Sequence, residues 1–133
     1  MAFSGPQSDQ LAIRQLLNAY DDAVAMRDVE AWASAWTPDA QWNIAGKSAS
    51  GVEALKTLWL SIMAQTQFVA LSSTPGLIEV VGDEARGRVH TAETIFFGDG
   101  SEKRFWGRYE DTLRRTNGEW RFSIRTYQML RQA

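Results

Sequence analysis

The chain has 133 residues, a length that fits one domain with its own core. The absence of cysteine and the presence of one histidine exclude disulfides, thiolate chemistry and metal sites built from several histidines. A net charge of −2 gives no reason to expect nucleic acid or an anionic membrane as a partner. No segment has the pattern of a signal peptide or a membrane span, so we expect a cytoplasmic protein.

The first residues predict one long helix. We expect residues 1–7 to form a flexible tail and Ser8 to cap the helix that follows. This helix is indicated by apolar residues at relative positions 0, 3, 4, 7 and 11, which share one helical face: Ile13, Leu16, Leu17, Tyr20 and Val24.

Two shorter helices are predicted next. The first begins near Asp28 and ends before Pro38, because proline disfavours helix in the residue before it. A short strand is expected over residues 41–44. Ser50 with Glu53 three residues later is typical of a capping box, which predicts a third helix that runs to about residue 65.

The second half has the composition of long strands. Four β-rich runs cover residues 67–81, 84–97, 102–115 and 119–130, with short Gly, Asn and Asp links that are typical of antiparallel hairpins. Long twisted strands make a sheet curl. We therefore predict a single α+β domain over residues 1–133, with three N-terminal helices packed in the concave face of a curved, mainly antiparallel sheet.

These elements carry motifs that resemble the SnoaL-like group of the nuclear transport factor 2-like superfamily. The resemblance covers almost the whole chain but is weak for function, because this fold hosts many activities. The residues that carry it are Ala12–Leu17, Tyr20, Asp28, Trp36–Trp42, Gly51, Gly82–Ala85, Gly107–Asp111, Asn117–Phe122 and Arg125.

The resemblance implies a small-molecule pocket without a cofactor, and commonly a homodimer. Its members include polyketide cyclases, scytalone dehydratase, ketosteroid isomerase and hexachlorocyclohexane dehydrochlorinase. In the dehydratase and the dehydrochlorinase, an Asp on the first helix orients a His on the first long strand, and this His is the general base. The matching positions here fall on Ala25 and on or near Ala70, so the usual dyad is absent.

Two carboxylates are candidates to replace that dyad. Asp21 lies one helical turn before Ala25 and borders the apolar stripe, although Asp21 and Asp22 also fit a solvated helix edge. Glu93 alternates with apolar residues on one strand face, where a buried charge must be paired or functional. The alternative for Glu93 is an exposed strand end.

Tyr109 and Arg125 are the candidates to stabilise negative charge, whereas Asp111 reads as a structural hydrogen-bond acceptor. A two-residue Asn117-Gly118 turn would make Arg125 face outward. A three-residue loop with a bulge at Gly118 would turn Arg125 inward. We favour the inward register.

The inward register also predicts an aromatic patch on the convex face, formed by Trp120, Phe122, Ile124, Trp106 and Phe96. Such a patch favours burial between two identical sheets. Alternatively, these residues are core. The residues expected to form the pocket wall are Tyr20, Val24, Trp42, Trp59, Ile62, Phe68, Thr91, Ile95, Phe105 and Tyr127.

Three functions fit these expectations. The first is a cofactor-free lyase, isomerase or cyclase that acts on a small hydrophobic cyclic molecule, with Asp21 or Glu93 as the base and Arg125 or Tyr109 as the electrostatic partner. The second is a binding or accessory protein of the same fold, which the missing dyad favours. The third is a protein-interaction module.

Overall fold

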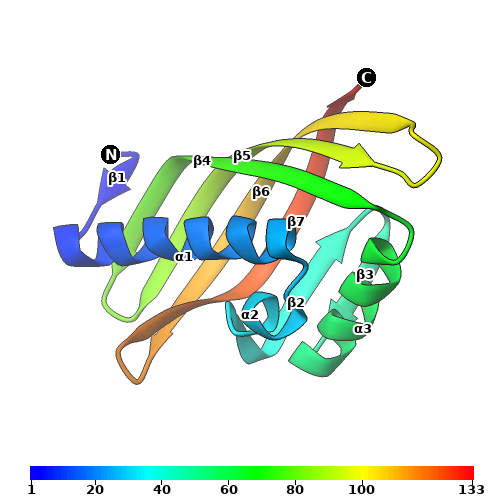
Figure 1. Cartoon of the computed structure of the whole chain (residues 1–133). Helices are drawn as coiled ribbons and strands as arrows, with labels where there is room; N and C mark the ends of the chain where they lie inside the picture. The colour runs from blue at the N-terminus through cyan, green and yellow to red at the C-terminus, as the bar shows by residue number, and fades with distance from the viewer.

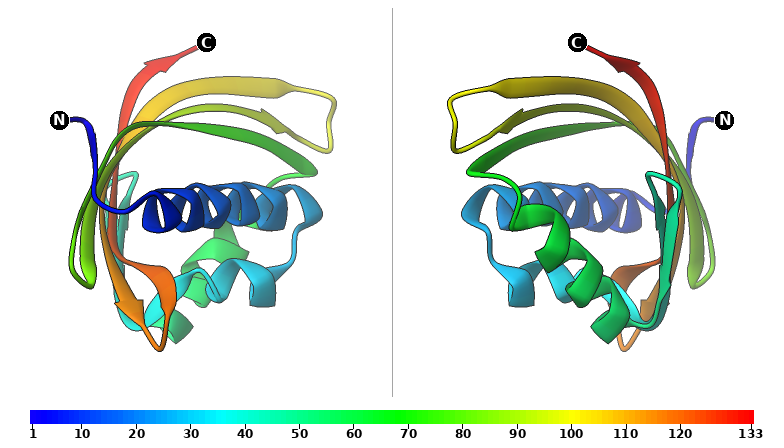
Figure 2. Two further views of the ribbon diagram at one scale, coloured as in Figure 1. Left: turned by 90° about the vertical axis from the view of Figure 1, so that its left-hand side faces the viewer. Right: turned by 90° about the vertical axis from the view of Figure 1, so that its right-hand side faces the viewer.

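The computed structural model describes residues 1–133 and has three helices on one side of a single seven-stranded sheet. Figure 1 shows the helices in front of the sheet, and Figure 2 shows the long strands curling over helix α1. The predicted α+β fold is confirmed. The helices are α1 (Gln7–Met26), α2 (Val29–Ala33) and α3 (Val52–Met63).

The sheet has the order β1-β4-β5-β6-β7-β2-β3. Its centre is an antiparallel meander of four long strands, whose bounds lie within about two residues of the predicted runs. The strands are β1 (Phe3–Ser4), β2 (Trp36–Ile44), β3 (Lys47–Ser50), β4 (Phe68–Val81), β5 (Glu84–Phe96), β6 (Glu102–Thr116) and β7 (Glu119–Gln132).

The N-terminal residues differ from the expected flexible tail. Strand β1 pairs in parallel with β4, and the Ile78 amide donates to the Ala2 carbonyl at 2.8 Å. The Gln10 side-chain amide donates to the Ser4 and Ile78 carbonyls, each at 2.8 Å. All three acceptors and one of the three donors are backbone groups, so side-chain types gave little indication of these bonds.

Neither of the two predicted helix caps forms, and the one side-chain cap is on α2. Asp28 accepts a hydrogen bond from the Ala31 amide at 3.0 Å and caps α2. The residues that cap α1 and α3 are Pro6 and Gly51, without a side-chain bond, so the caps predicted at Ser8 and Ser50 are wrong. Gly51 has a φ of 86°, which favours glycine, and its amide donates to the Ala40 carbonyl at 2.8 Å. This backbone contact fixes where α3 begins.

The register of the last hairpin is set by a β-bulge. Asn117-Gly118 is a two-residue turn, not the three-residue loop that we favoured, and Leu113 pairs with Phe122. Ser123 is then left over, and Asp111 pairs with Arg125. The Ser123 hydroxyl donates to the Thr112 carbonyl at 3.0 Å. The bulge turns Arg125 inward while keeping the tight turn.

The two aromatic residues before the bulge keep the phase that the tight turn sets and face the core. Trp120 and Phe122 are buried, so their predicted place on the convex face is wrong. Phe96, Trp106 and Ile124 do remain partly exposed, with 36%, 39% and 38% of their surface accessible. The expected convex patch is therefore smaller than predicted.

Aromatic rings fill the space between the helices and the sheet. Trp32 stacks on Trp59 with ring centroids 5.2 Å apart and also lies against Trp42 and Tyr20. This cluster joins α1, α2, α3 and β2 through direct ring contacts. No helix is both long enough and apolar enough to cross a bilayer.

Candidate functional site

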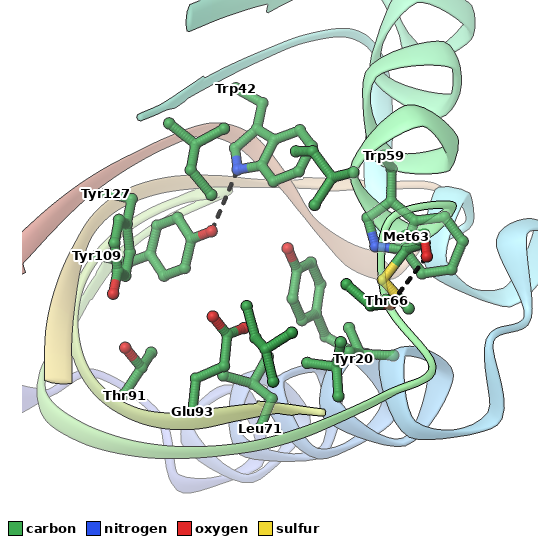
Figure 3. A pocket seen from close by; sticks show the side chains of 15 residues that line it. Tyr20, Trp42, Trp59, Met63, Thr66, Leu71, Thr91, Glu93, Tyr109 and Tyr127 are labelled. Carbon is green, nitrogen blue, oxygen red and sulfur yellow. Dashed lines mark hydrogen bonds between the residues drawn. The ribbon is translucent and has the colours of Figure 1, made fainter. Parts of the chain in front are cut away.

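A cavity of about 90 Å³ lies between the helices and the concave face of the sheet (Figure 3). Ten of the residues expected at the site line it: Tyr20, Val24, Trp42, Trp59, Ile62, Thr91, Glu93, Ile95, Tyr109 and Tyr127. Sequence reasoning missed five further lining residues: Ile44, Met63, Thr66, Val69 and Leu71.

Four expected residues do not line the cavity. Phe68 is 42% exposed and stacks on Phe96. It points away from the cavity because its neighbour Val69 is the residue of β4 that points inward. Phe105 lies opposite Glu93 on the neighbouring strand but beyond the cavity wall. The other two are Asp21 and Arg125. Neither lines the cavity, but each acts on a residue that does: Asp21 on Glu93 and Arg125 on Tyr109.

Glu93 is the one charged residue that lines the cavity. It lies in the last third of β5, where it pairs with Leu71 of β4 on one side and with Phe105 of β6 on the other. Figure 3 shows its carboxyl group pointing into the space between the aromatic side chains. Burial raises the pKa of Glu93 to about 7, and the negative charge of Asp21 adds to the increase. Glu93 can therefore both accept and release a proton near neutral pH.

Asp21 lies on helix α1, close enough to Glu93 for its charge to act on that carboxyl group. The Ser73 hydroxyl donates to Asp21 Oδ1 at 2.8 Å and fixes the carboxyl group. Burial raises the pKa of Asp21 to about 6, while the bond from Ser73 and the charge of Arg125 oppose that increase. Asp21 is thus a second, coupled carboxylate that acts on Glu93 by its charge.

The positions of the family dyad hold no proton-transferring group. Ala25 lies one turn after Asp21, and Ala70 is exposed on the far side of β4. The neighbours of Ala70 that do line the cavity, Val69 and Leu71, are aliphatic. Any proton transfer in this cavity must therefore use Glu93 or a phenol.

The coupled carboxylates predict a pH dependence of stability. Both pKa values are raised in the folded state, so the stability contributed by the protonated carboxyls is complete below about pH 4 and is lost as the pH rises through about 6 and 7. Urea unfolding at pH 5 and pH 8 should therefore show Glu93→Gln gaining stability relative to the wild type at pH 8. An equal difference at both pH values would contradict this.

Three phenols face the same space as Glu93. The Trp42 indole N–H donates to the Tyr109 hydroxyl oxygen at 3.1 Å. Burial raises the pKa of Tyr20, and raises that of Tyr109 well above its usual value, so both stay protonated. A Cβ atom at Gly107 would lie 2.2 Å from the Tyr127 hydroxyl, so only glycine leaves room for that phenol.

Arg125 is buried and packs against two of these phenols, Tyr20 and Tyr109. Its guanidinium donates to both carboxylate oxygens of Asp111, at 2.8 and 3.0 Å, and both side chains are 1% exposed. Its Cζ lies 3.8, 4.2 and 4.7 Å from the ring centroids of Tyr109, Phe122 and Tyr20. Burial tends to lower the pKa of Arg125, but Asp111 raises it above its usual value. Arg125 thus positions Tyr109 and Tyr20 and does not contact a ligand directly.

Arg27 closes the wall of the cavity near Thr66. It ends α1 and donates to the Met63 carbonyl at 2.7 Å and to the Thr66 hydroxyl at 3.0 Å. Arg27→Met removes these bonds at the C-terminus of α3, so we expect a loss of about 1–2 kcal/mol in urea unfolding. Arg14→Met, on an exposed part of the same helix, serves as the control and should cost less. Equal losses would contradict the role of Arg27.

The side chains that could bind a metal are dispersed. Nowhere do three or more His, Asp or Glu side chains come together. The cavity is instead a mainly apolar, aromatic site with one carboxyl group and several hydroxyls, which is the usual character of a small-molecule site.

Solved structures share this architecture. A protein provisionally named scytalone dehydratase from Novosphingobium aromaticivorans matches with a TM-score of 0.89 and 20% identity over 96% of this chain and 87% of its own. For the hexachlorocyclohexane dehydrochlorinase of Novosphingobium barchaimii, the TM-score is 0.84 and the identity 20% over 96% and 90%. Rv3472 of Mycobacterium tuberculosis, of unknown function, gives 0.85 and 28% over 95% and 79%.

No curated protein sequence matches the chain. The SnoaL-like domain family, in contrast, matches residues 7–126, which cover the three helices, the first three strands of the meander and the first part of β7. This range includes the two carboxylates Asp21 and Glu93, the phenols of Tyr20 and Tyr109, and Arg125, and it ends one residue before Tyr127. The chain belongs to the SnoaL-like domain family.

Proposed function

We propose that the protein is a cofactor-free lyase- or isomerase-type enzyme that acts on a small hydrophobic cyclic molecule. The observation that carries the proposal is Glu93: one carboxyl group, with a pKa raised to about 7, inside an aromatic cavity. A base with a pKa near the working pH is well suited to proton transfer. The dehydratase and dehydrochlorinase names among the similar structures agree with lyase chemistry.

In this mechanism Glu93 removes a proton from a carbon next to a carbonyl group. The electron pair of the C–H bond moves into a new C=C bond, and the carbonyl oxygen becomes negative. The Tyr109 hydroxyl, with Tyr20 beside it, donates to that oxygen. The intermediate then expels the leaving group from the β-carbon, and a departing hydroxyl group takes the proton from Glu93 and leaves as water; alternatively, the intermediate takes the proton back at another carbon. The first outcome is elimination, and the second is isomerisation.

Hydrogen exchange tests this proposal without knowledge of the natural substrate. Monocyclic ketones, with and without a hydroxyl group on the β-carbon, are incubated with the protein in D₂O and followed by NMR. We expect deuterium at the α-carbon in both sets and loss of water from the hydroxyketones. Ketones that bind, yet exchange no faster than in buffer, would contradict the proposal.

The second candidate is a non-catalytic binding protein. The absence of the family dyad at Ala25 and Ala70 favours it. Tight binding of such ketones without exchange is the result that this candidate predicts, so the same experiment separates the two functions.

We also propose that the chain forms a homodimer through the convex face of the sheet. Phe96, Trp106 and Ile124, together with Phe68, remain partly exposed there and support this proposal. Sedimentation equilibrium should give twice the chain mass. A monomer at all concentrations would contradict it.

A further inference from the structure

The cavity offers an anionic ligand no positive charge. Glu93 is its one charged lining residue, and Arg125, the nearest buried cation, is already bound by both oxygens of Asp111 and enclosed by rings. The charge of the lining is therefore −1 when Glu93 is ionised and zero when it is protonated. A carboxylate or phosphate ligand would lose its hydration without gaining a partner.

The hydroxyl proton of Tyr109 has a direction that the fold determines. An indole N–H can only donate, so the Tyr109 oxygen must accept from Trp42. The proton of that hydroxyl then points elsewhere, either toward the neighbouring Tyr20 hydroxyl or toward a ligand in the cavity. Figure 3 shows the Tyr109 hydroxyl facing the cavity, on the opposite side from Glu93. Thr91 adds a second polar group, because its buried Oγ1 has no partner.

We propose that Trp42 is a positioning residue that makes Tyr109 a donor to the oxygen of an uncharged, one-ring ligand held against Glu93. This inference rests on the proposed function of the same site and names its ligand class. A carbonyl oxygen, which only accepts, matches the hydroxyl proton of Tyr109. A ring matches the aromatic walls formed by Tyr20 and Trp59.

The size of the cavity sets the limit of one ring. Its volume of about 90 Å³ is smaller than the cavity of about 150 Å³ that holds benzene in an engineered protein core. A single six-membered ring is therefore the largest ring system that we expect this cavity to take, and a fused two-ring compound is too large for it.

Four ligands built on the same six-membered ring test separately the effect of the ligand's charge and the effect of its hydrogen-bond acceptor. They are cyclohexanone, methylenecyclohexane, cyclohexanecarboxylate and protonated cyclohexylamine, titrated at pH 8 with tryptophan fluorescence as the readout, since Trp42 and Trp59 line the cavity. We expect cyclohexanone to bind about fivefold to tenfold tighter than methylenecyclohexane, the advantage of one hydrogen bond. The carboxylate should bind weakest. Tightest binding of the amine or the carboxylate would overturn the inference.

Two variants separate the donor from its positioning residue. Tyr109→Phe should remove the preference for cyclohexanone over methylenecyclohexane and leave the hydrocarbon affinity unchanged. Trp42→Phe should reduce the same preference, and the double variant should lose no more than Tyr109→Phe alone. A Trp42→Phe variant that lowers both affinities equally would mean a structural role only, which overturns the inference.

A measurement on the unmodified protein covers the case in which Trp42→Phe does not fold. The Trp42 indole proton, observed by NMR, should move downfield with cyclohexanone and stay in place with methylenecyclohexane, because linked hydrogen bonds strengthen each other. No difference between the two ligands would overturn the role of Trp42. Binding of the ketone without α-hydrogen exchange would instead refute the enzymatic function and leave this ligand class intact.

Discussion

Asp111→Ala is expected to lower the free energy of unfolding by about 3–5 kcal/mol, because it leaves the Arg125 charge buried and unpaired. Both side chains are 1% exposed, and the two bonds between them are the only ion pairing that Arg125 has. Urea unfolding followed by tryptophan fluorescence measures the loss. The same variant should disturb the cavity, since the guanidinium lies 3.8 Å from the Tyr109 ring centroid.

The neighbouring residue provides the control for Asp111. Glu110 pairs with Arg88 on the exposed face, so Glu110→Ala should cost less than about 1 kcal/mol. A double variant, Asp111→Leu with Arg125→Met, should recover much of the stability, because it removes the buried charge together with its partner. If Asp111→Ala cost no more than Glu110→Ala, Arg125 would not be the buried ion that we describe.

Glu93→Gln is expected to slow α-hydrogen exchange by about 10²- to 10⁴-fold, the contribution of one general base. Glutamine keeps the size of the side chain but cannot accept a proton at this pH. The NMR exchange assay measures the effect. Glu84→Gln, at the exposed start of the same strand, is the matched control and should keep the wild-type rate. A Glu93→Gln variant with full activity would remove Glu93 from the mechanism.

The pH profile of exchange adds a second readout on the same residue. A base must be ionised to act, so the rate should rise with pH through the Glu93 pKa of about 7. Asp21→Asn removes a negative charge that raises this pKa, so the midpoint should move to lower pH. A midpoint that does not move would show that Asp21 does not act on Glu93.

The layout of helices and long strands could be predicted because periodicity reports burial directly. The apolar stripe along α1 and the alternation along β5 predicted that Tyr20, Glu93 and Ile95 face the cavity, and all three line it. Strand β1 could not be predicted in the same way. It is held largely by backbone hydrogen bonds, which leave no trace in side-chain types.

Arg125 shows what the sequence could not predict about the site, namely the position of the β-bulge. Its inward direction was expected, but for the wrong reason: the extra residue is Ser123 in mid-strand and not Gly118 in the turn. A one-residue shift reverses every side chain beyond it, so Trp120 and Phe122 were assigned to the wrong face. The serine is an ordinary strand residue, and nothing in its neighbourhood marks a bulge.

The sequence also did not indicate how deeply each inward-facing side chain is buried. Alternation indicates which face a residue lies on, but not whether a side chain ends in a cavity or beneath it. Asp21 and Arg125 both turn toward the interior, yet Ser73 and Asp111 bind them before they reach the cavity. Their partners lie more than ten residues away in sequence, and only the fold brings them together.

The most direct test is a ¹³C NMR titration of the Glu93 side-chain carboxyl carbon, in the wild type and in Asp21→Asn. We expect a midpoint near 7 in the wild type and a lower one in the variant. A midpoint near the usual glutamate value of about 4.3, in both proteins, would mean that this carboxyl group is in water. The cavity would then hold no base, and the proposed chemistry would be wrong.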